Sequence, residues 1–521
     1  MRSAAKILPP VSSVPALMVQ GVSSNAGKSL MTAAFCRIFA RRGLSVAPFK
    51  AQNMALNSFV TRDGKEMGRA QALQAQACGL EADVCMNPVL LKPTSRAGSQ
   101  IIVMGHSAGW MHAREYLQYK ATAWKTVQTA YRSLSAGRDV MVLEGAGSPA
   151  EINLMAHDIV NMRMARFAGA QVLLVADIDR GGAFAGIVGT MSLLGRADRA
   201  RVAGYILNKF RGDASLLDPA LVAVSSRTRK PFMGIVPMLA DLRLPEEDSV
   251  GFKGGEIPRI FSAPALNCLA ERQCLDIAVA DLPYISNFTD LDALRHEPCV
   301  RVRTMRTAED MGKPDAVILP GSKNTLADLR FLRESGLADR LCRYAGEGGT
   351  LVGICGGLQL LGKIIADPRG LEDGGEAPGL GLLPLHTRLD SKKRLRRTEG
   401  RALAALAESE SAVAGYEIHH GVTSPDGDIA PIPVLEDTEG RIIGWGRRGL
   451  DGGTRVWGTY LHGIFDMDDF RHDFLNQLRR RAGFALLSGI AYNIGPELDR
   501  LADTVEQCLD MKAVYSLIGK N

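Results

Sequence analysis

The sequence predicts an α/β protein built from two doubly wound, mostly parallel sheets. Short, fully apolar runs alternate with helical stretches, which is the pattern of parallel strands covered by helices on both faces. Glycine is abundant at 55 residues while aromatic residues make up only 6%, a composition that favours tight strand-to-helix turns over an all-β sandwich. The alternation stops near residue 240 and resumes at 276, so the 521 residues divide into two such units.

The predicted strands form two series, rich in Val, Leu and Ile, whose members end in polar or glycine turns. The first series comprises residues 16–19, 44–49, 140–143, 172–176, 202–207 and 232–236. The second series comprises residues 276–279, 300–302, 316–319, 350–353 and 455–460. Ligands of such sheets bind beyond the carboxyl ends of the strands, so the residues that follow each run are the candidates for a functional site.

The strand series sets the expected domain boundaries. We expect a first domain over 1–245, a linker over 246–274, a second domain over 275–470 and C-terminal helices over 471–521. Acidic clusters, paired glycines and prolines indicate the linker, and 367–378 is expected to be a glycine- and acid-rich loop. In the final segment, apolar side chains recur at a helical spacing typical of a core or an interface: Leu498, Leu501, Val505 and Leu509.

Composition and charge exclude several classes of protein. The 62 Lys and Arg residues exceed the 56 Asp and Glu residues by only six, which is too mild an excess to indicate nucleic-acid binding. The nine cysteines form no C-x-x-C pair, so zinc ribbons and thioredoxin-like motifs find no support. No apolar run approaches the roughly 18–20 residues of a membrane span, and the start lacks the apolar core of a signal peptide. We therefore expect a cytoplasmic protein that binds neither nucleic acid nor membranes.

A phosphate-binding turn follows the first predicted strand. It contains Gly21, Asn25, Gly27, Lys28 and Ser29, with five residues between the two glycines. Glycines allow backbone N–H groups to face an anion, lysine reaches phosphate oxygens and serine can bind Mg²⁺. This pattern predicts a nucleotide site, and the alternative is a structural glycine turn.

Polar residues at other strand ends could complete this site. Glu144 follows the strand at 140–143 and is a candidate Mg²⁺ ligand, the alternative being a helix-capping acid. Asp177 and Asp179 are weaker candidates for the same role. Asn208 could contact a nucleotide base or could simply form a turn.

A cysteine elbow marks the second domain. Cys355 lies on a glycine-flanked turn between the strand at 350–353 and a helix, a place that exposes a thiol to a helix N-terminus. The spelling G-x-C-x-G-x-Q predicts a nucleophile, and the alternative is a buried structural cysteine. Backbone N–H groups of Gly356 and Gly321 are candidates for an oxyanion hole.

His462 is the candidate base because it follows the strand at 455–460, where it can face Cys355. His419 and His420 compete for this role but lie in a loop-like stretch that we expect to shape the pocket. Position 464, where an orienting carboxylate would stand, is Ile, so we expect a Cys–His dyad. The predicted chemistry is attack on a side-chain amide, a thioester intermediate and release of ammonia.

These motifs carry a resemblance to a known family. GICGGLQLLG together with GTYLHGIF resembles class I glutamine amidotransferases with a Cys–His dyad, and the stretched phosphate turn resembles dethiobiotin synthetase-like enzymes. The combination is similar to the corrinoid amidoligases. Within these, FKAQNMALNS at 49–58 and the segment 66–93 favour the cobyric acid synthases, and the resemblance covers about 16 to 515.

The resemblance implies an ATP- and glutamine-dependent ligase that amidates adenosylcobyrinic acid a,c-diamide at side chains b, d, e and g, giving adenosylcobyric acid. It implies Cys355 as nucleophile, His462 as base, Lys28 and Ser29 as phosphate ligands and Glu144 as a Mg²⁺ ligand. ATP and Mg²⁺ would be required, glutamine and the corrinoid would be substrates, and ammonia would pass between the domains. The oligomeric state stays open.

A set of polar residues would suit a substrate bearing many amides and carboxylates, although glutamines on a helix surface are the alternative: Gln52, Asn53, Asn57, Arg69, Gln71 and Gln74. Other functions also stay open at this point. They are a cobyrinic acid a,c-diamide synthase, a P-loop ATPase with a non-catalytic amidotransferase-like module, and a ligase for a non-corrinoid acid such as a cell-wall precursor.

Overall fold

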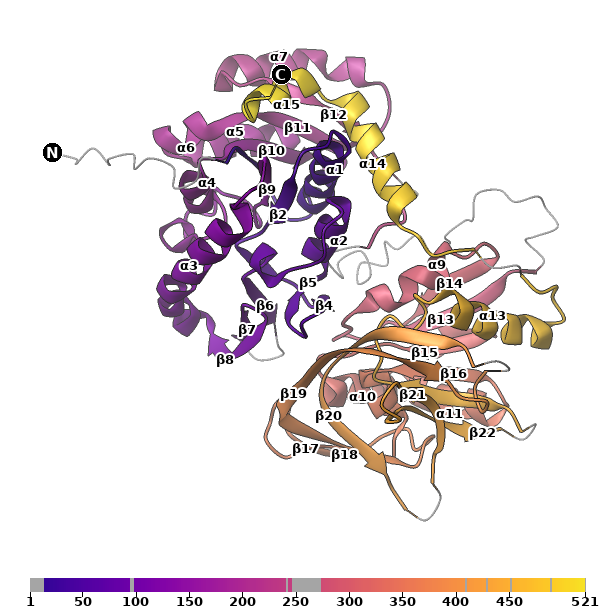
Figure 1. The fold of residues 1–521 in the computed structure, drawn as a ribbon. Helices are drawn as coiled ribbons and strands as arrows, with labels where there is room; N and C mark the ends of the chain where they lie inside the picture. Colours follow the sequence, from indigo (N-terminus) through magenta and orange to yellow (C-terminus); the bar gives the residue numbers. More distant parts are fainter. Residues whose placement is uncertain are drawn as a thin grey trace.

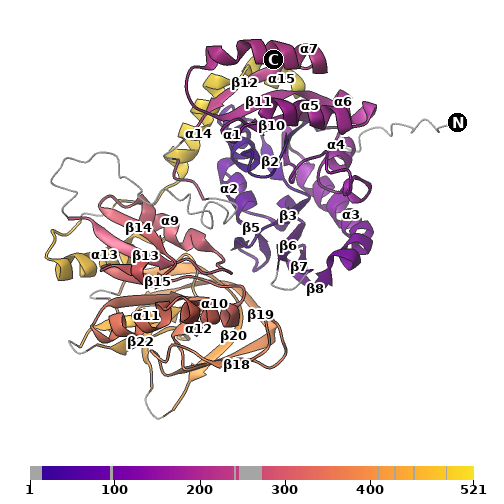
Figure 2. The ribbon, with the colours of Figure 1, turned by 180° about the vertical axis from the view of Figure 1, so that it is seen from behind.

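The computed structural model describes residues 14–93, 98–239, 242–245, 273–407, 410–427, 430–449, 452–487 and 490–520. Two α/β domains lie against each other, and the C-terminal helices return to the first of them (Figures 1 and 2). The predicted fold class is confirmed. The predicted linker over 246–274 falls almost entirely on 246–272, which lie outside the described residues.

The first domain is built on a parallel six-stranded sheet with the order β12-β11-β10-β1-β9-β2. Its strands are β1 (Ala16–Gly21), β2 (Val46–Phe49), β9 (Val140–Glu144), β10 (Gln171–Asp177), β11 (Val202–Phe210) and β12 (Phe232–Pro237). Each matches one of the predicted apolar runs. Because β1 lies between β9 and β10, the turn after Gly21 is flanked by Glu144 and Asp177.

Helices cover both faces of this sheet. They are α1 (Lys28–Arg41), α2 (Arg69–Ala77), α3 (Ala113–Ser135), α4 (Met162–Ala168), α5 (Ala183–Leu193), α6 (Arg196–Arg201) and α7 (Asp218–Thr228). Two separate apolar cores result, one on each face, with Met18 in one and Leu17 in the other. This is the two-faced burial that the continuous apolar strands predict.

An arm inserted between β2 and α3 extends toward the second domain (Figures 1 and 2). Besides α2 it contains short strands: β3 (Gln52–Met54), β4 (Ser58–Val60), β5 (Glu66–Gly68), β6 (Val89–Pro93), β7 (Gly98–Val103) and β8 (His106–His112). The strands β4 and β5 form a two-stranded antiparallel sheet, and the others form a second small sheet. The sequence analysis did not predict this arm, because β3, β4 and β5 have only three residues each and β8 is exposed along nearly its whole length, so these strands give no apolar run.

The second sheet is parallel on one side and antiparallel on the other, in the order β14-β13-β15-β16-β23-β22-β21-β19-β17-β18, with β20 paired to β19. Its parallel strands β13 (Leu275–Ala280), β14 (Val300–Met305), β15 (Ala316–Leu319), β16 (Thr350–Ile354) and β23 (Thr454–Thr459) match the predicted series. The remaining strands are β17 (Ile364–Asp367), β18 (Gly375–Pro378), β19 (Leu385–Ala402), β20 (Ala412–Pro425), β21 (Ile432–Asp437) and β22 (Ile442–Arg448). The stretch around His419, expected to be loop-like, is thus part of the long strand β20.

The helices of the second domain are α9 (Asp292–His296), α10 (Thr325–Glu334), α11 (Leu337–Gly346), α12 (Gly356–Leu361) and α13 (Asp468–Ala482). The last of these packs within the second domain, where Phe470 and Phe474 contact the ring of Trp457 edge-on. The chain then crosses back to the first domain.

The helices α14 (Gly495–Cys508) and α15 (Met511–Leu517) pack on α1 of the first domain. Leu498, Leu501 and Val505 are at most 1% exposed and belong to the same core as α1. The Arg37 guanidinium donates to both carboxylate oxygens of Asp499 at 2.8 and 3.0 Å. The apolar spacing of the final segment therefore marks a core that joins the two ends of the chain.

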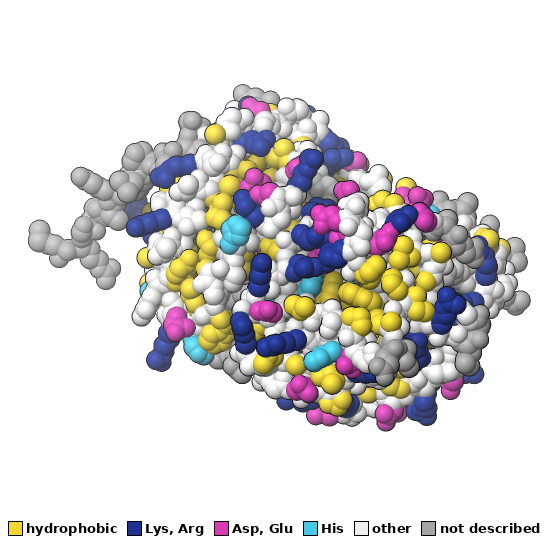
Figure 3. All heavy atoms as spheres, turned by 60° about the horizontal axis from the view of Figure 1, so that its bottom comes forward, with side chains coloured by type: hydrophobic (Ala, Val, Ile, Leu, Met, Phe, Trp, Pro, Cys, Tyr) yellow, Lys and Arg dark blue, Asp and Glu magenta, His cyan; other side chains and the backbone are white. Residues whose placement is uncertain are grey.

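Among the residues that the structure describes, no helix has both the length and the apolar character that a membrane crossing requires. On the face drawn in Figure 3, lysine and arginine side chains lie among carboxylates and apolar atoms, in keeping with the small net charge of +6.

Replacing Leu501 with Ala should destabilise the first domain by about 2–5 kcal/mol, because it empties part of the core between α14 and α1. Urea unfolding followed by circular dichroism measures this. The matched control is Asp503→Ala, which removes a surface ion pair to Arg41 and should cost less than about 1 kcal/mol. Equal midpoints for the two variants would contradict the assignment of α14 to the core.

Candidate functional site

The turn after β1 is shaped by close contacts that require glycine. Gly27 has a φ of 96° and caps α1, and a Cβ atom there would lie 2.0 Å from the amide nitrogen of Asn208. A Cβ atom on Gly21 would lie 2.8 Å from the carbonyl oxygen of Ser23. The Lys28 ammonium donates to the same carbonyl at 2.8 Å, so this lysine lies across the turn. Glycine, lysine and helix N-terminus are thus arranged around one anion-sized site.

Two residues of β11 contact the turn through hydrogen bonds. Asn208 donates from Nδ2 to the carbonyl oxygen of Ala26 at 2.9 Å, and Lys209 donates to the carbonyl oxygen of Asn25 and to Asp177, both at 2.8 Å. The Asn208 amide thus contacts the turn itself, and its contact with a nucleotide base stays a prediction. Asp177 pairs with Lys209 rather than pointing freely at the turn.

Glu144 is the buried centre of a polar network beside the turn. Its side chain is fully shielded from solvent, and Oε1 accepts from Ser29 Oγ at 2.7 Å and from Lys50 Nζ at 2.8 Å. Its Oε2 accepts from Gln74 at 2.6 Å and from Gln71 at 3.3 Å. These four donors all meet the Glu144 carboxyl group at the carboxyl end of β9.

The donor set beside the turn fits a magnesium ion bound with a phosphate. Ser29 Oγ and Glu144 Oε1 are 2.7 Å apart, so both oxygens can face one cation at the start of α1. Among the described residues no group of three or more His, Cys, Asp or Glu side chains could hold a metal. The chain would thus supply two oxygens, and phosphate and water the rest, with Lys50 as the competing cation on Glu144.

Three of the six polar residues expected at a substrate site belong to this network: Asn53, Gln71 and Gln74. Gln71 and Gln74 are completely buried, so they are not helix-surface glutamines, and both donate to Glu144. Asn53 donates to Gln71 at 2.9 Å, and Gln52 accepts from Tyr116 at 2.7 Å. Two more of the expected residues lie closer to the second domain: Asn57 is buried next to β4, and Arg69 stacks on the ring of Phe59.

In the second domain, Cys355 sits at a strained elbow between β16 and α12. Its φ of 54° and ψ of −104° are rare for a residue with a Cβ atom. Glycines permit the bend, since a Cβ atom on Gly357 would lie 1.9 Å from the carbonyl oxygen of Leu319. A Cβ atom on Gly356 would lie 2.7 Å from the backbone nitrogen of Ser322, so the two turns proposed as the oxyanion hole touch. Gly321 adjoins them, within reach of the His462 ring.

His462 is completely buried and is oriented by a carboxylate. Its Nδ1 lies 2.7 Å from Asp290 Oδ2, and Asp290 Oδ1 accepts from the backbone N–H of Gly463 at 2.8 Å. Burial acts to lower the pKa of His462, but Asp290 and then the Cys355 sulfur raise it to about 10. The residues form a Cys–His–Asp triad, with Nε2 left to exchange a proton with Cys355.

Asp290 is a residue of the candidate site that the sequence analysis did not predict. It lies 172 residues before His462, in the short 3₁₀ helix at Phe288–Leu291, whereas the carboxylate was sought at position 464. No local motif marks it, because only tertiary packing brings this helix next to the residues that follow β23.

A pocket of about 240 Å³ opens at Cys355 between the domains. His419 and His420 line it from β20, in line with the expectation that they shape the pocket. His419 stacks on Tyr460 at 3.6 Å, and burial lowers the pKa of His420 to about 4. Trp110 of the arm forms part of the opposite wall.

The arm reaches the triad directly. The backbone N–H of Ser58 in β4 donates to Asn287 Oδ1 at 2.9 Å, and Asn287 Nδ2 lies 3.3 Å from His462 Nε2. Tyr416, whose ring stacks on His462, donates its hydroxyl to the carbonyl oxygen of Ser58 at 3.1 Å. One residue of the first domain, Ser58, thus contacts two of the residues that touch the His462 imidazole.

A buried cluster of charged residues lies at the contact between the arm and the second domain. Glu66 of β5 accepts from Lys92 Nζ and from Ser58 Oγ, both at 2.8 Å, and also pairs with Lys393 of the second domain. Burial acts to raise the pKa of Glu66, but the ammonium groups of Lys393 and Lys92 hold it well below its usual range. Removing one partner would leave a buried charge uncompensated, so the cluster ties the two domains together.

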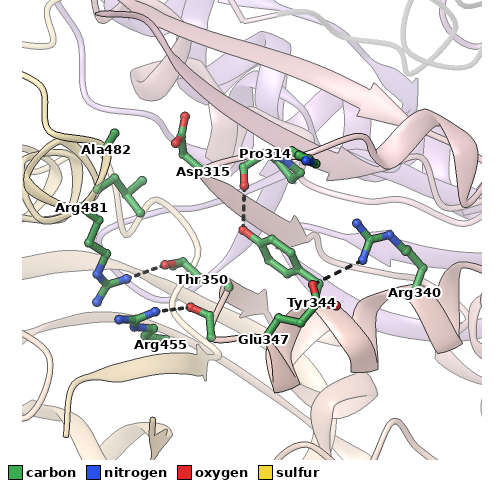
Figure 4. A pocket seen from close by; sticks show the side chains of 13 residues that line it. Pro314, Asp315, Arg340, Tyr344, Glu347, Thr350, Arg455, Arg481 and Ala482 are labelled. Atoms are coloured by element: carbon green, nitrogen blue, oxygen red, sulfur yellow. Dashed lines mark hydrogen bonds and ion pairs between the residues drawn. The ribbon is translucent and has the colours of Figure 1, made fainter. Parts of the chain in front are cut away.

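A further cavity of about 370 Å³ lies at the opposite end of the second sheet from Cys355 (Figure 4). Arg481 donates to Thr350 Oγ1 at 2.7 Å, and Tyr344 donates to the carbonyl oxygen of Pro314 at 3.0 Å. These groups belong to the amino ends of β15 and β16, and none of the triad lines the cavity.

Comparison with known families matches both domains. Residues 17–250 match the CobQ/CobB/MinD/ParA nucleotide binding domain, and residues 276–470 match the CobB/CobQ-like glutamine amidotransferase domain. The chain is 54% identical to a cobyric acid synthase of Nitratidesulfovibrio vulgaris, with 98% of each chain covered. It is 48% identical to that of Moorella thermoacetica, with 97% of each covered, and 46% identical to that of Desulfitobacterium hafniense, with 96% of this chain and 98% of the relative covered.

Replacing Asp290 with Asn should lower the pKa of His462 from about 10 to the ordinary value of about 6.5 or below, because burial then dominates. In the native protein, charged His462 stabilises the fold below about pH 6.5, and this contribution is lost as the pH rises toward 10. NMR titration of the His462 ring proton measures both pKa values, with His462→Gln identifying the resonance. Titration near 6.5 in the native protein would contradict the triad.

Proposed function

This chain belongs to the cobyric acid synthase family, and on that premise we propose that it amidates adenosylcobyrinic acid a,c-diamide at side chains b, d, e and g. The product is adenosylcobyric acid, ATP supplies the free energy and glutamine supplies the nitrogen. The observation that carries the proposal is the junction at Ser58, which joins the Cys355 triad to the domain that holds the phosphate turn.

The triad can release ammonia from glutamine. His462, oriented by Asp290, can exchange a proton with the Cys355 thiol, so the sulfur can attack the side-chain carbonyl of glutamine. A C–S bond forms at the side-chain carbonyl, and the C–N bond breaks as His462 gives its proton to the leaving amine. Water then hydrolyses the thioester to glutamate. The backbone N–H groups of Gly356 and Gly321 are the proposed donors to the oxyanion.

The first domain can activate a carboxylate. Lys28 and the start of α1 would bind the ATP phosphates, and Ser29 with Glu144 would hold Mg²⁺, which neutralises phosphate charge when bound. A carboxylate oxygen of the corrinoid then takes the γ-phosphoryl group and releases ADP. Ammonia attacks the resulting acyl phosphate, an amide forms and phosphate leaves.

The position of the pocket supports internal transfer of ammonia. Its walls include Cys355 of the second domain and Lys92, Gln100 and Trp110 of the arm. Ammonia released at Cys355 would therefore form next to the first domain, where the activated carboxylate would consume it. Shielding from water also protects the acyl phosphate from hydrolysis.

The alternatives are less well supported. A P-loop ATPase with a non-catalytic second domain would have no use for His462 oriented by Asp290 at a cysteine elbow. A cobyrinic acid a,c-diamide synthase or a ligase for a non-corrinoid acid would share the site chemistry, but the named relatives that align along nearly the whole chain are cobyric acid synthases.

Cys355→Ala should abolish glutamine-dependent amidation and leave ammonia-dependent amidation within about twofold, because the thiol serves only ammonia release. Mass spectrometry of cobyrinic acid a,c-diamide after incubation with ATP-Mg²⁺ and either nitrogen source measures this. Native protein should convert the carboxylates to amides with glutamine and with ammonia. Without ATP it should convert them with neither nitrogen source. Glutamine hydrolysis with no corrinoid conversion would overturn the corrinoid assignment, and loss of both activities in Cys355→Ala would contradict two separable sites.

A further inference from the structure

The pocket at Cys355 contains two opposite charges that come from different segments of the second domain. Lys323 follows the Gly321 turn, and Glu372 lies between β17 and β18. Both line the same pocket of about 240 Å³ as the Cys355 thiol. A ligand that reaches the thiol therefore passes beside both charges.

Neither charge is neutralised by an ion pair within the described residues. Glu372 Oε2 accepts from the backbone N–H of Thr325 at 2.6 Å, and Lys323 Nζ lies 3.4 Å from the amide oxygen of Gln100. Burial raises the pKa of Glu372 to about 8, and burial together with Lys92 lowers that of Lys323. Burial disfavours the charged form of each group, and the opposite charge that acts on Glu372 in this pocket is Lys323 itself. A ligand that carries both an ammonium and a carboxylate group would favour the charged forms of both.

The other polar groups of the pocket already have partners. Lys92 and Lys393 are both paired with Glu66. The Gln359 amide accepts from Thr325 Oγ1 at 2.9 Å and donates to the hydroxyl of Tyr460 at 3.2 Å. This leaves Glu372, which can carry a negative charge, and Lys323, which can carry a positive charge, to recognise a ligand.

We propose that Glu372 binds the α-ammonium group and Lys323 the α-carboxylate group of free L-glutamine, and that these two residues restrict Cys355 to the free amino acid. The inference deepens the proposed function and rests on it. A molecule with an ammonium and a carboxylate on one carbon atom is the complement of the two charges, and its side-chain amide would extend toward Cys355. A glutamine residue within a peptide has neither charge and would be rejected.

Two glutamine analogues test the assignment one charge at a time. Glutaramate lacks the α-ammonium group and L-glutaminamide lacks the α-carboxylate group, while both keep the side-chain amide. Native protein should hydrolyse each with a kcat/KM at least about 100-fold below that for L-glutamine, because each analogue leaves one buried charge of the pocket unpaired. Ammonia release measured in a coupled assay gives these ratios.

Variants of Glu372 and Lys323 should each lose discrimination against only one of the two analogues. Glu372→Gln should raise the KM for glutamine at least about tenfold and reduce discrimination against glutaramate only. Lys323→Gln should do the same for glutaminamide only. The matched controls are Glu376→Gln in β18 and Lys392→Gln in β19, whose side chains are exposed and lie outside the pocket. Both controls should keep the native KM values and ratios.

Equal hydrolysis of glutamine and glutaramate by native protein would overturn the proposal. Because this comparison uses native protein, it does not depend on whether a variant folds. Equal KM values for Glu372→Gln and Glu376→Gln would also overturn it. Failure of the corrinoid proposal would appear separately, as glutamine hydrolysis that discriminates as expected but produces no corrinoid amide.

Discussion

The buried junction between the arm and the second domain is the contact on which the rest of the structure depends. Glu66, held by Lys92 of its own domain and Lys393 of the other, fixes the β4–β5 hairpin against β19 and β20. That hairpin presents both backbone groups of Ser58 to residues that touch His462. The geometry of the triad is therefore completed by the other domain.

The same hairpin leads back to the phosphate turn. The helix α2 begins directly after β5, and its Gln71 and Gln74 bind Glu144, which accepts from Ser29 at the start of α1. Packed and hydrogen-bonded groups therefore run without a break from the nucleotide end of the molecule to Asn287 beside His462. Contiguity of this kind gives a physical route by which occupancy of one site can influence the other.

The sequence allowed prediction of the parallel strands and of the site residues that directly follow them. Apolar runs located the parallel strands, and turn chemistry pointed to Cys355 and Lys28, because both features are local. Asp290 could not be found, since only tertiary packing brings it to a histidine 172 residues away. The stretch around His419 was expected to be loop-like but forms part of the strand β20. The glutamines of α2 were expected to suit a substrate, with a helix surface as the alternative, but they are buried around Glu144.

The central claim is that ammonia made at Cys355 reaches the first domain without entering bulk water. Native protein, ATP-Mg²⁺ and the corrinoid should be incubated with [amide-¹⁵N]glutamine and an excess of unlabelled ammonium, at a pH where added ammonia alone supports little turnover. Mass spectrometry of the product measures the label. The account predicts amides that retain nearly all the ¹⁵N of glutamine. Amides labelled only in proportion to the mixed ammonia pool would contradict it.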